Sequence, residues 1–225
     1  MNVALVRFKL AAYVRSHLVL QPVLALLALM ILLYSTRVPA GGELSAYADS
    51  AVLLTLICAW AARSLLNGEP DTQRLVSMTS AGRPHREIAA GLVAAAVVNL
   101  SLAALAVAIP LAIGFAATPG GGVLGTAAAV HLLGVSAGTA LGAVTSRPLL
   151  PSPATSLLAL LGGYVALVVL SVTPLAWASA VPAVLWMRAA NDGELAARLP
   201  LFAAQTLVWS GVALAVYAVL RRTRP

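Results

Sequence analysis

Lysine is almost absent from this chain of 225 residues, which carries a single one, Lys9. A phosphate-binding loop of the form G-x-x-x-x-G-K-[S/T] needs a lysine directly after a glycine. Because Lys9 follows Phe8, with no glycine nearby, the chain has no such loop. Any ATP that this protein uses must therefore bind to another chain.

Cysteine, acidic residues and histidine are also scarce, with one, seven and three copies. The lone Cys58 falls inside an apolar run, where it cannot form an intramolecular disulfide and is expected to be a small packing residue. The sequence has no cluster of cysteine, histidine and acidic residues that would suit a metal ion. No apolar segment has an acidic residue near its centre, which disfavours a proton-coupled carrier.

Apolar residues make up most of the chain: 61% of the residues are hydrophobic and only 9% are charged. This balance lies outside the range of soluble globular domains and indicates a membrane protein. The net charge of +7 does not favour nucleic acid as a partner, because the basic residues stand at the ends of apolar segments. Membrane lipid is the partner that this pattern predicts.

Six apolar segments are long enough to cross a bilayer core, which takes about 20 residues per helix. They are residues 18–34, 46–66, 88–115, 123–144, 154–173 and 201–220. We therefore expect an all-α integral membrane protein, with residues 1–225 forming one domain of six transmembrane helices.

Arginine and lysine are distributed unequally between the two sides of this arrangement. Eleven of them fall on the side that holds both termini and the stretch Arg63–Arg86, and three (Arg37, Arg188 and Arg198) fall on the other. The positive-inside rule then predicts that both termini and this stretch are cytoplasmic. Five or seven spans would instead put the basic tail on the side of Glu43 and Asp49.

The N-terminal residues have two interpretations. Residues 1–17 are expected to form an amphipathic helix on the cytoplasmic face of the membrane. The side chains expected to face lipid are Val3, Val6, Leu10 and Tyr13. Alternatively, the basic start, the apolar run and the sequence TRVPAGG resemble a signal peptide cleaved after Ala40. Arg37 disfavours cleavage, because cleavage regions prefer small neutral residues.

Residues 67–87 form the longest polar stretch in the first half of the chain. Pro70 suits the first turn of a helix, and Gly82 and Pro84 suit its end. We expect a short helix from about Pro70 to Ser80, with an apolar edge made by Leu75, Val76 and Met78. Such an edge suits a groove on a partner protein. The alternative is that the edge dips into the lipid headgroups.

The run Leu75–Gly91, LVSMTSAGRPHREIAAG, resembles the cytoplasmic loop between the second and third helices of ABC transporter permeases of the type-two exporter class. The resemblance rests on a charged lead and on an Arg-Glu-aliphatic-x-x-Gly entry into the next span. The matching residues are Glu69, Asp71, Arg74, Arg86, Glu87, Ile88 and Gly91. Val76 and Ser77 depart from the family pattern by interrupting its leucine-rich turn, and residues 82–85 are richer in glycine and proline than usual.

The resemblance implies a permease subunit of an ATP-driven exporter in the bacterial plasma (inner) membrane. In that family the loop is a coupling helix that docks on a separate cytoplasmic ATP-binding subunit, which holds the ATP and magnesium, and a second permease copy or a sister permease completes the path. The permease chain itself has no cofactor and is not an enzyme. The residues expected to carry the coupling are Glu69, Asp71, Arg74, Leu75, Met78, Arg83, Arg86 and Glu87.

Residues 174–200 are expected to form an extracytoplasmic hairpin that is interfacial or re-entrant, because they are too few to cross the membrane twice. In the family this region covers the outer mouth of the path. The alternative is a loop on the lipid headgroups, with Trp177 and Trp186 as anchors.

Gly134, Ser136 and Gly138 match the G-x-S-x-G pattern of hydrolases. His131 cannot be the base, because it lies five residues before Ser136 on the same predicted helix, about 140° around the helix axis. Helix packing explains the pattern better, since Gly134, Gly138 and Gly142 recur every four residues and make a groove for another helix.

Asn99 and His131 are polar residues inside predicted spans. We expect each to make a buried hydrogen bond between helices, with substrate contact as the alternative. The predicted path is apolar, which favours a lipid-like, peptide or antibiotic-like cargo. Two other functions stay open: the substrate-binding membrane subunit of a vitamin-type importer, and a membrane scaffold without transport.

Overall fold

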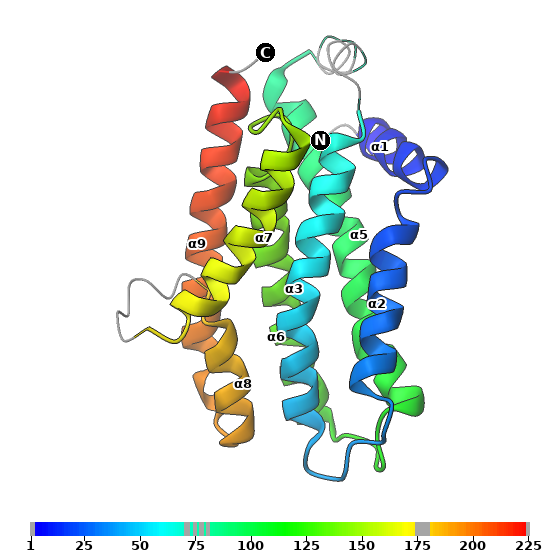
Figure 1. Ribbon diagram of the computed structural model, residues 1–225, viewed down its shortest axis with the longest axis vertical. Helices are drawn as coiled ribbons and strands as arrows, with labels where there is room; N and C mark the ends of the chain where they lie inside the picture. Colours follow the sequence, from blue (N-terminus) through cyan, green and yellow to red (C-terminus); the bar gives the residue numbers. More distant parts are fainter. Residues whose placement is uncertain are drawn as a thin grey trace.

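The structure is a computed structural model that describes residues 3–69, 73, 76, 79, 82–173 and 181–223. These residues are helical apart from short connections, and they contain no β-strand (Figure 1). The helices are α1 (Val3–Arg15), α2 (Leu20–Leu33), α3 (Glu43–Asn67), α5 (Pro84–Ile113), α6 (Gly121–Val144), α7 (Pro153–Leu170), α8 (Ala183–Asn191) and α9 (Leu195–Thr223).

Five helices, α3, α5, α6, α7 and α9, are long and apolar enough to cross a membrane. The helices α1 and α2 meet that criterion only as a pair bent by 69°, which gives up to six spans if the bent pair counts as one. Alone, α2 has 14 residues, fewer than the 17 to 25 that a span usually takes. The prediction of an all-helical chain with several apolar spans is confirmed.

The helices α3 and α6 form the centre of the bundle. In their most apolar windows 61% and 67% of the residues are buried, against 11% for α7 and 17% for α9. The outer helices present large aliphatic side chains on their surface, such as Ile31 on α2, Leu158 on α7 and Val208 on α9. In a membrane these side chains face lipid, because exposing them to water would be unfavourable.

Three glycines explain how closely α3 and α6 approach each other. Gly134, Gly138 and Gly142 lie along the face of α6 that packs on α3. A Cβ atom at Gly138 would lie 2.6 Å from the carbonyl oxygen of Thr55, and one at Gly142 would clash with the backbone of Ala59. Any side chain at these positions would therefore push the two central helices apart.

The two ends of the bundle hold different segments (Figure 1). Both termini, the end of α3, the start of α5 and the α6–α7 connection lie at one end, shown at the top. The α2–α3, α5–α6 and α8–α9 connections lie at the other. There an isolated β-bridge joins Val38 to Phe115, and the Val38 N–H donates to the Gly114 carbonyl oxygen at 2.8 Å.

The apolar face of α1 packs on protein. Val6 and Tyr13 are buried in a cluster with Ala62 of α3 and with Ala90 and Ala94 of α5. The expectation that Val6 and Tyr13 face lipid is therefore wrong, because the alanine-rich surface of α5 gives this face a place to pack. Val3, in contrast, is exposed.

The segment before the last span differs from a loop on the membrane surface. Trp186 on α8 is fully buried and packs in a core cluster that includes Ala48 and Val52 of α3. Trp186 is therefore not a headgroup anchor, although the alternative for residues 174–200 expected it to be one. Trp177, the other expected anchor, lies outside the described residues. The final helix begins at Leu195 rather than Leu201. An ion pair between Glu194 and Arg198 at 2.6 Å stabilises its start.

Candidate coupling site at one end of the bundle

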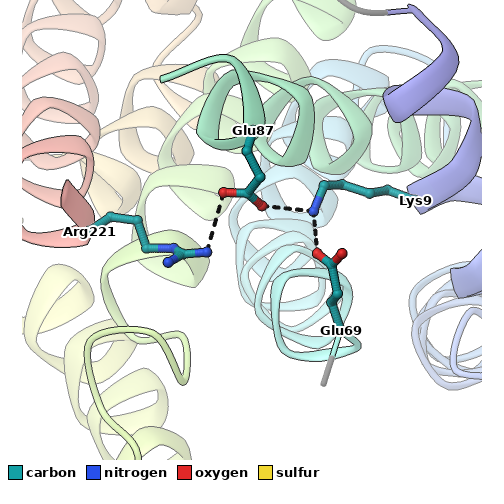
Figure 2. Close-up of polar contacts among 4 residues, drawn as sticks. All are labelled: Lys9, Glu69, Glu87 and Arg221. Atoms are coloured by element: carbon teal, nitrogen blue, oxygen red, sulfur yellow. Dashed lines mark hydrogen bonds and ion pairs between the residues drawn. The ribbon is translucent and has the colours of Figure 1, made fainter. Parts of the chain in front are cut away.

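Four charged side chains form a continuous ion-pair network at the end of the bundle that holds the termini (Figure 2). The Nζ atom of Lys9 lies 2.6 Å from Oε2 of Glu69 and 2.8 Å from Oε1 of Glu87. The other carboxylate oxygen of Glu87, Oε2, accepts a hydrogen bond from Nη2 of Arg221 at 3.3 Å. Two carboxylates and two cations thus balance one another.

The four residues of this network come from four different parts of the chain. Lys9 lies on α1, Glu69 follows the end of α3, Glu87 lies in the first turn of α5, and Arg221 lies in the last turn of α9. Glu87 and Arg221 also suit their positions on the helix dipoles, since an acid is stabilised at an N-terminus and a base at a C-terminus. The network therefore joins the first and last helices to both ends of the polar stretch 67–87.

All four side chains of the network are nearly buried. Their exposed fractions are 10% for Lys9, 10% for Glu69, 6% for Glu87 and 4% for Arg221. Removing one member would leave a buried charge without its counter-charge, which costs about 3–5 kcal/mol for a buried pair. The network thus acts as one unit that holds the polar stretch to the bundle.

Two further contacts fix the end of α3. The backbone N–H of Arg147 donates to Oδ1 of Asn67 at 2.6 Å, which joins the end of α3 to the α6–α7 connection. One turn earlier, the Nε atom of Arg63 donates to Oγ of Ser156 on α7 at 2.6 Å. The helix that leads into the polar stretch is therefore held from three sides, by α1, by α7 and by the α6–α7 connection.

The predicted coupling residues fall into three groups. Glu69 and Glu87 belong to the ion-pair network, and their carboxylates bind Lys9. Arg83 and Arg86 are exposed at the start of α5. The other four predicted coupling residues lie outside the described residues; they are Asp71, Arg74, Leu75 and Met78.

The residues that the structure describes within the polar stretch fit a short helix that ends before α5. Gln73, Val76 and Thr79 are helical, and Val76 is exposed. Gly82 then has a φ of +72°, a left-handed conformation that glycine adopts without strain. Its N–H donates to the Thr79 carbonyl oxygen at 3.2 Å, and α5 starts at Pro84, the first helical position that proline favours.

Lys9 and Arg221 are the two members of the network that were not predicted from the sequence to belong to the site. Lys9 lies four residues after Leu5 and four residues before Tyr13, both of which are buried, so all three share one face of α1. A lysine in the middle of an apolar stripe needs a buried counter-charge. That spacing was a usable indication of a partner, whereas nothing near Arg221 in the sequence indicates Glu87.

The two polar residues inside predicted spans each reach a neighbouring helix. Nδ2 of Asn99 on α5 donates to the Cys58 carbonyl oxygen of α3 at 3.1 Å and to Oγ1 of Thr139 on α6 at 2.9 Å. Nε2 of His131 on α6 lies 3.1 Å from Oγ of Ser50 on α3. Both side chains therefore link helices within the centre of the bundle.

No metal cluster accompanies these polar contacts, since no three His, Cys, Asp or Glu side chains gather around a common point anywhere in the described part of the chain. In comparisons with known proteins, no family model, no curated protein and no solved structure matches the chain. The geometry of the ion-pair network and the arrangement of the helices are therefore the basis for a functional proposal.

Proposed function

We propose that this chain is the permease subunit of an ATP-driven exporter, coupled to a separate cytoplasmic ATP-binding subunit through residues 67–87. The protein works as a dimer, or with a sister permease, in a bacterial plasma membrane with both termini in the cytoplasm. It carries a lipid-like, peptide or antibiotic-like substrate and does no bond chemistry itself.

One observation carries the proposal: the polar stretch 67–87 is fixed at both ends to the same buried lysine. Glu69 at its start and Glu87 at its end both bind Lys9 within 2.8 Å. A loop that only connected two spans would need no such attachment. A force applied to an attached loop passes into α3 and α5, whereas a flexible connection would absorb it.

The order of the elements also supports the proposal. An amphipathic helix comes first, a polar loop follows the second apolar segment, and a short helix, α8, precedes the last span. The resemblance to type-two exporter permeases implies a coupling helix within residues 67–87 and a segment within residues 174–200 that covers the outer mouth of the path. The helix within residues 1–17 is expected from its own apolar and polar residues. The end of α3 and the start of α5, which flank the polar loop, lie at the same end of the bundle as α1 and the end of α9 (Figure 1), which agrees with the unequal distribution of arginine.

The experiment that tests the proposal is affinity purification of the chain from its native membrane in mild detergent, followed by mass spectrometry. The proposal predicts a stoichiometric partner whose sequence contains a phosphate-binding loop of the G-x-x-x-x-G-K-[S/T] form. The importer alternative predicts instead a tightly retained small ligand. Recovery of neither would favour the scaffold and contradict the proposal.

A further inference from the structure

A cleft of about 200 Å³ lies between α6, α7 and α9, away from the ion-pair network. Its walls are almost entirely aliphatic and aromatic. The residues that shape it include Ala137, Ala140, Leu167, Trp209, Ser210 and Ala213. For comparison, an apolar cavity of about 150 Å³ holds a benzene ring, so this cleft has room for one ring or one short alkyl chain with a small substituent.

The Ser210 hydroxyl on α9 lines this cleft and has no hydrogen-bond partner among the described residues. The side chain is buried, with 3% of its surface exposed. A buried hydroxyl without a partner is unfavourable in an apolar environment. The cleft therefore contains one polar atom that a ligand could satisfy.

Two buried or partly buried threonine hydroxyls show how a helix can satisfy such a group by itself, whereas Thr206 on α9 and Tyr13 on α1 lack a partner among the described residues, as Ser210 does. Oγ1 of Thr55 donates to the carbonyl oxygen of Ala51, and Oγ1 of Thr126 donates to that of Gly122, each at 3.0 Å. This bond to the residue four positions earlier is the usual arrangement of serine and threonine in helices. Ser210 lacks it, so its hydroxyl is available to a molecule in the cleft.

The depth of Ser210 restricts what the molecule can be. Ser210 lies near the middle of α9, about 22 Å along the helix from Leu195. If α9 crosses the bilayer, a phospholipid places only its hydrocarbon chains at this depth and leaves the hydroxyl without a partner. A small molecule with a polar group on a short apolar body can satisfy Ser210 and fill the cleft at the same time.

We infer that the cleft between α6, α7 and α9 binds a small apolar molecule with one hydrogen-bonding group, of the size of a medium-chain alcohol or a phenol, whose oxygen bonds Oγ of Ser210. The inference does not rest on the proposed transport function. It lies within one chain and needs neither a partner subunit nor ATP.

The test uses a photoreactive diazirine analogue of octanol, with the full chain in phospholipid nanodiscs and labelled peptides mapped by mass spectrometry. We expect saturable labelling of the peptide that contains Trp209–Ala213, and we expect excess octanol to compete it away. The variant Ser210→Ala should raise the half-saturating concentration about threefold to tenfold, as expected for one lost hydrogen bond. The variant Ala213→Phe, which fills the cleft, should reduce the labelling at least about tenfold.

Two matched variants provide the controls. Ser101→Ala removes an exposed hydroxyl from α5, and Ala104→Phe adds a ring to the exposed surface of α5; both should label as the wild type does. Labelling that does not saturate, or that octanol does not compete, would show occupation by bilayer chains and overturn the inference. A Ser210→Ala variant that labels with the same half-saturating concentration as Ser101→Ala would also overturn the inference. This comparison tests the role of Ser210 even if Ala213→Phe fails to fold.

Discussion

The Nζ atom of Lys9 lies 2.8 Å from Oε1 of Glu87, a residue 78 positions further along the chain. This ion pair joins α1 to the first turn of α5, and through Glu87 it reaches Arg221 in the last turn of α9. The only lysine of the chain is thus placed where it holds three helices and the start of the polar stretch together.

Replacing Lys9 by methionine should destabilise the protein strongly. The substitution keeps most of the side-chain volume but leaves Glu69 and Glu87 buried without their common counter-charge, which costs about 3–5 kcal/mol. For a chain of this length that loss corresponds to a fall of about 6–20 °C in the apparent melting temperature. Thermal unfolding of the purified protein in detergent measures it.

The control for Lys9→Met is Arg7→Met, which removes a positive charge from the exposed side of α1. This variant should melt within about 4 °C of the wild type, since an exposed charge contributes at most about 1 kcal/mol. If both variants melt at the same temperature, the ion-pair network does not hold the end of the bundle together.

Replacing Gly138 by alanine should separate the two central helices. The added Cβ would lie 2.6 Å from both the Thr55 carbonyl oxygen and Cβ of Cys58, and such overpacking costs about 1–3 kcal/mol. The matched variant is Gly211→Ala on α9, where an added Cβ meets nothing within 4 Å. Gly211→Ala should be neutral or more stable by up to about 1 kcal/mol, because alanine is the better helix former. Equal melting temperatures for the two variants would argue against close α3–α6 packing.

The membrane orientation can be tested with single cysteines in a Cys58→Ala background and a maleimide that does not cross membranes. Cysteines at Arg86 and Arg222 should react only in inverted vesicles, and cysteines at Arg37 and Asp192 only in intact spheroplasts. All four positions are exposed in the structure, so burial does not limit the reaction. Reaction of Arg86→Cys and Arg37→Cys from the same side would exclude the six-span arrangement with both termini in the cytoplasm.

Local features of the sequence predicted much of the helical arrangement. The apolar runs located α3, α5, α6 and α7 to within a few residues, because their length and composition are set by each segment alone. Gly82 and Pro84 likewise stand where the chain breaks before α5, since their backbone preferences do not depend on distant contacts.

Features that depend on contacts between distant residues could not be predicted in this way. The burial of Trp186 depends on α3 lying beside α8, and no property of residues 174–200 indicates that neighbour. The pairing of Lys9 with Glu69 and Glu87 likewise spans 60 and 78 residues. The spacing of Lys9 on α1 indicated a buried charge, but the choice of partner required the fold.

The apolar edge of the polar stretch is the surface that the proposed partner protein would contact. Leu75 and Met78 lie outside the described residues, so their role rests on the sequence and on the exposed position of Val76 between them. Replacing both by aspartate should leave membrane insertion intact, because the spans are unchanged. It should abolish docking of the proposed ATP-binding subunit, because burying two charges without partners in the interface would reduce the binding free energy by several times RT.

The most direct measurement is vanadate-sensitive ATP hydrolysis that co-purifies with the chain from its native membrane, compared between the wild type and the double variant Leu75→Asp, Met78→Asp. We expect hydrolysis with the wild type and less than about a tenth of that activity with the double variant at equal yield of the chain. Hydrolysis that is equal in both would show that this edge does not bind the ATP-binding subunit. A wild-type preparation that moves its cargo with no nucleotide hydrolysis by any associated chain would contradict the proposed function itself.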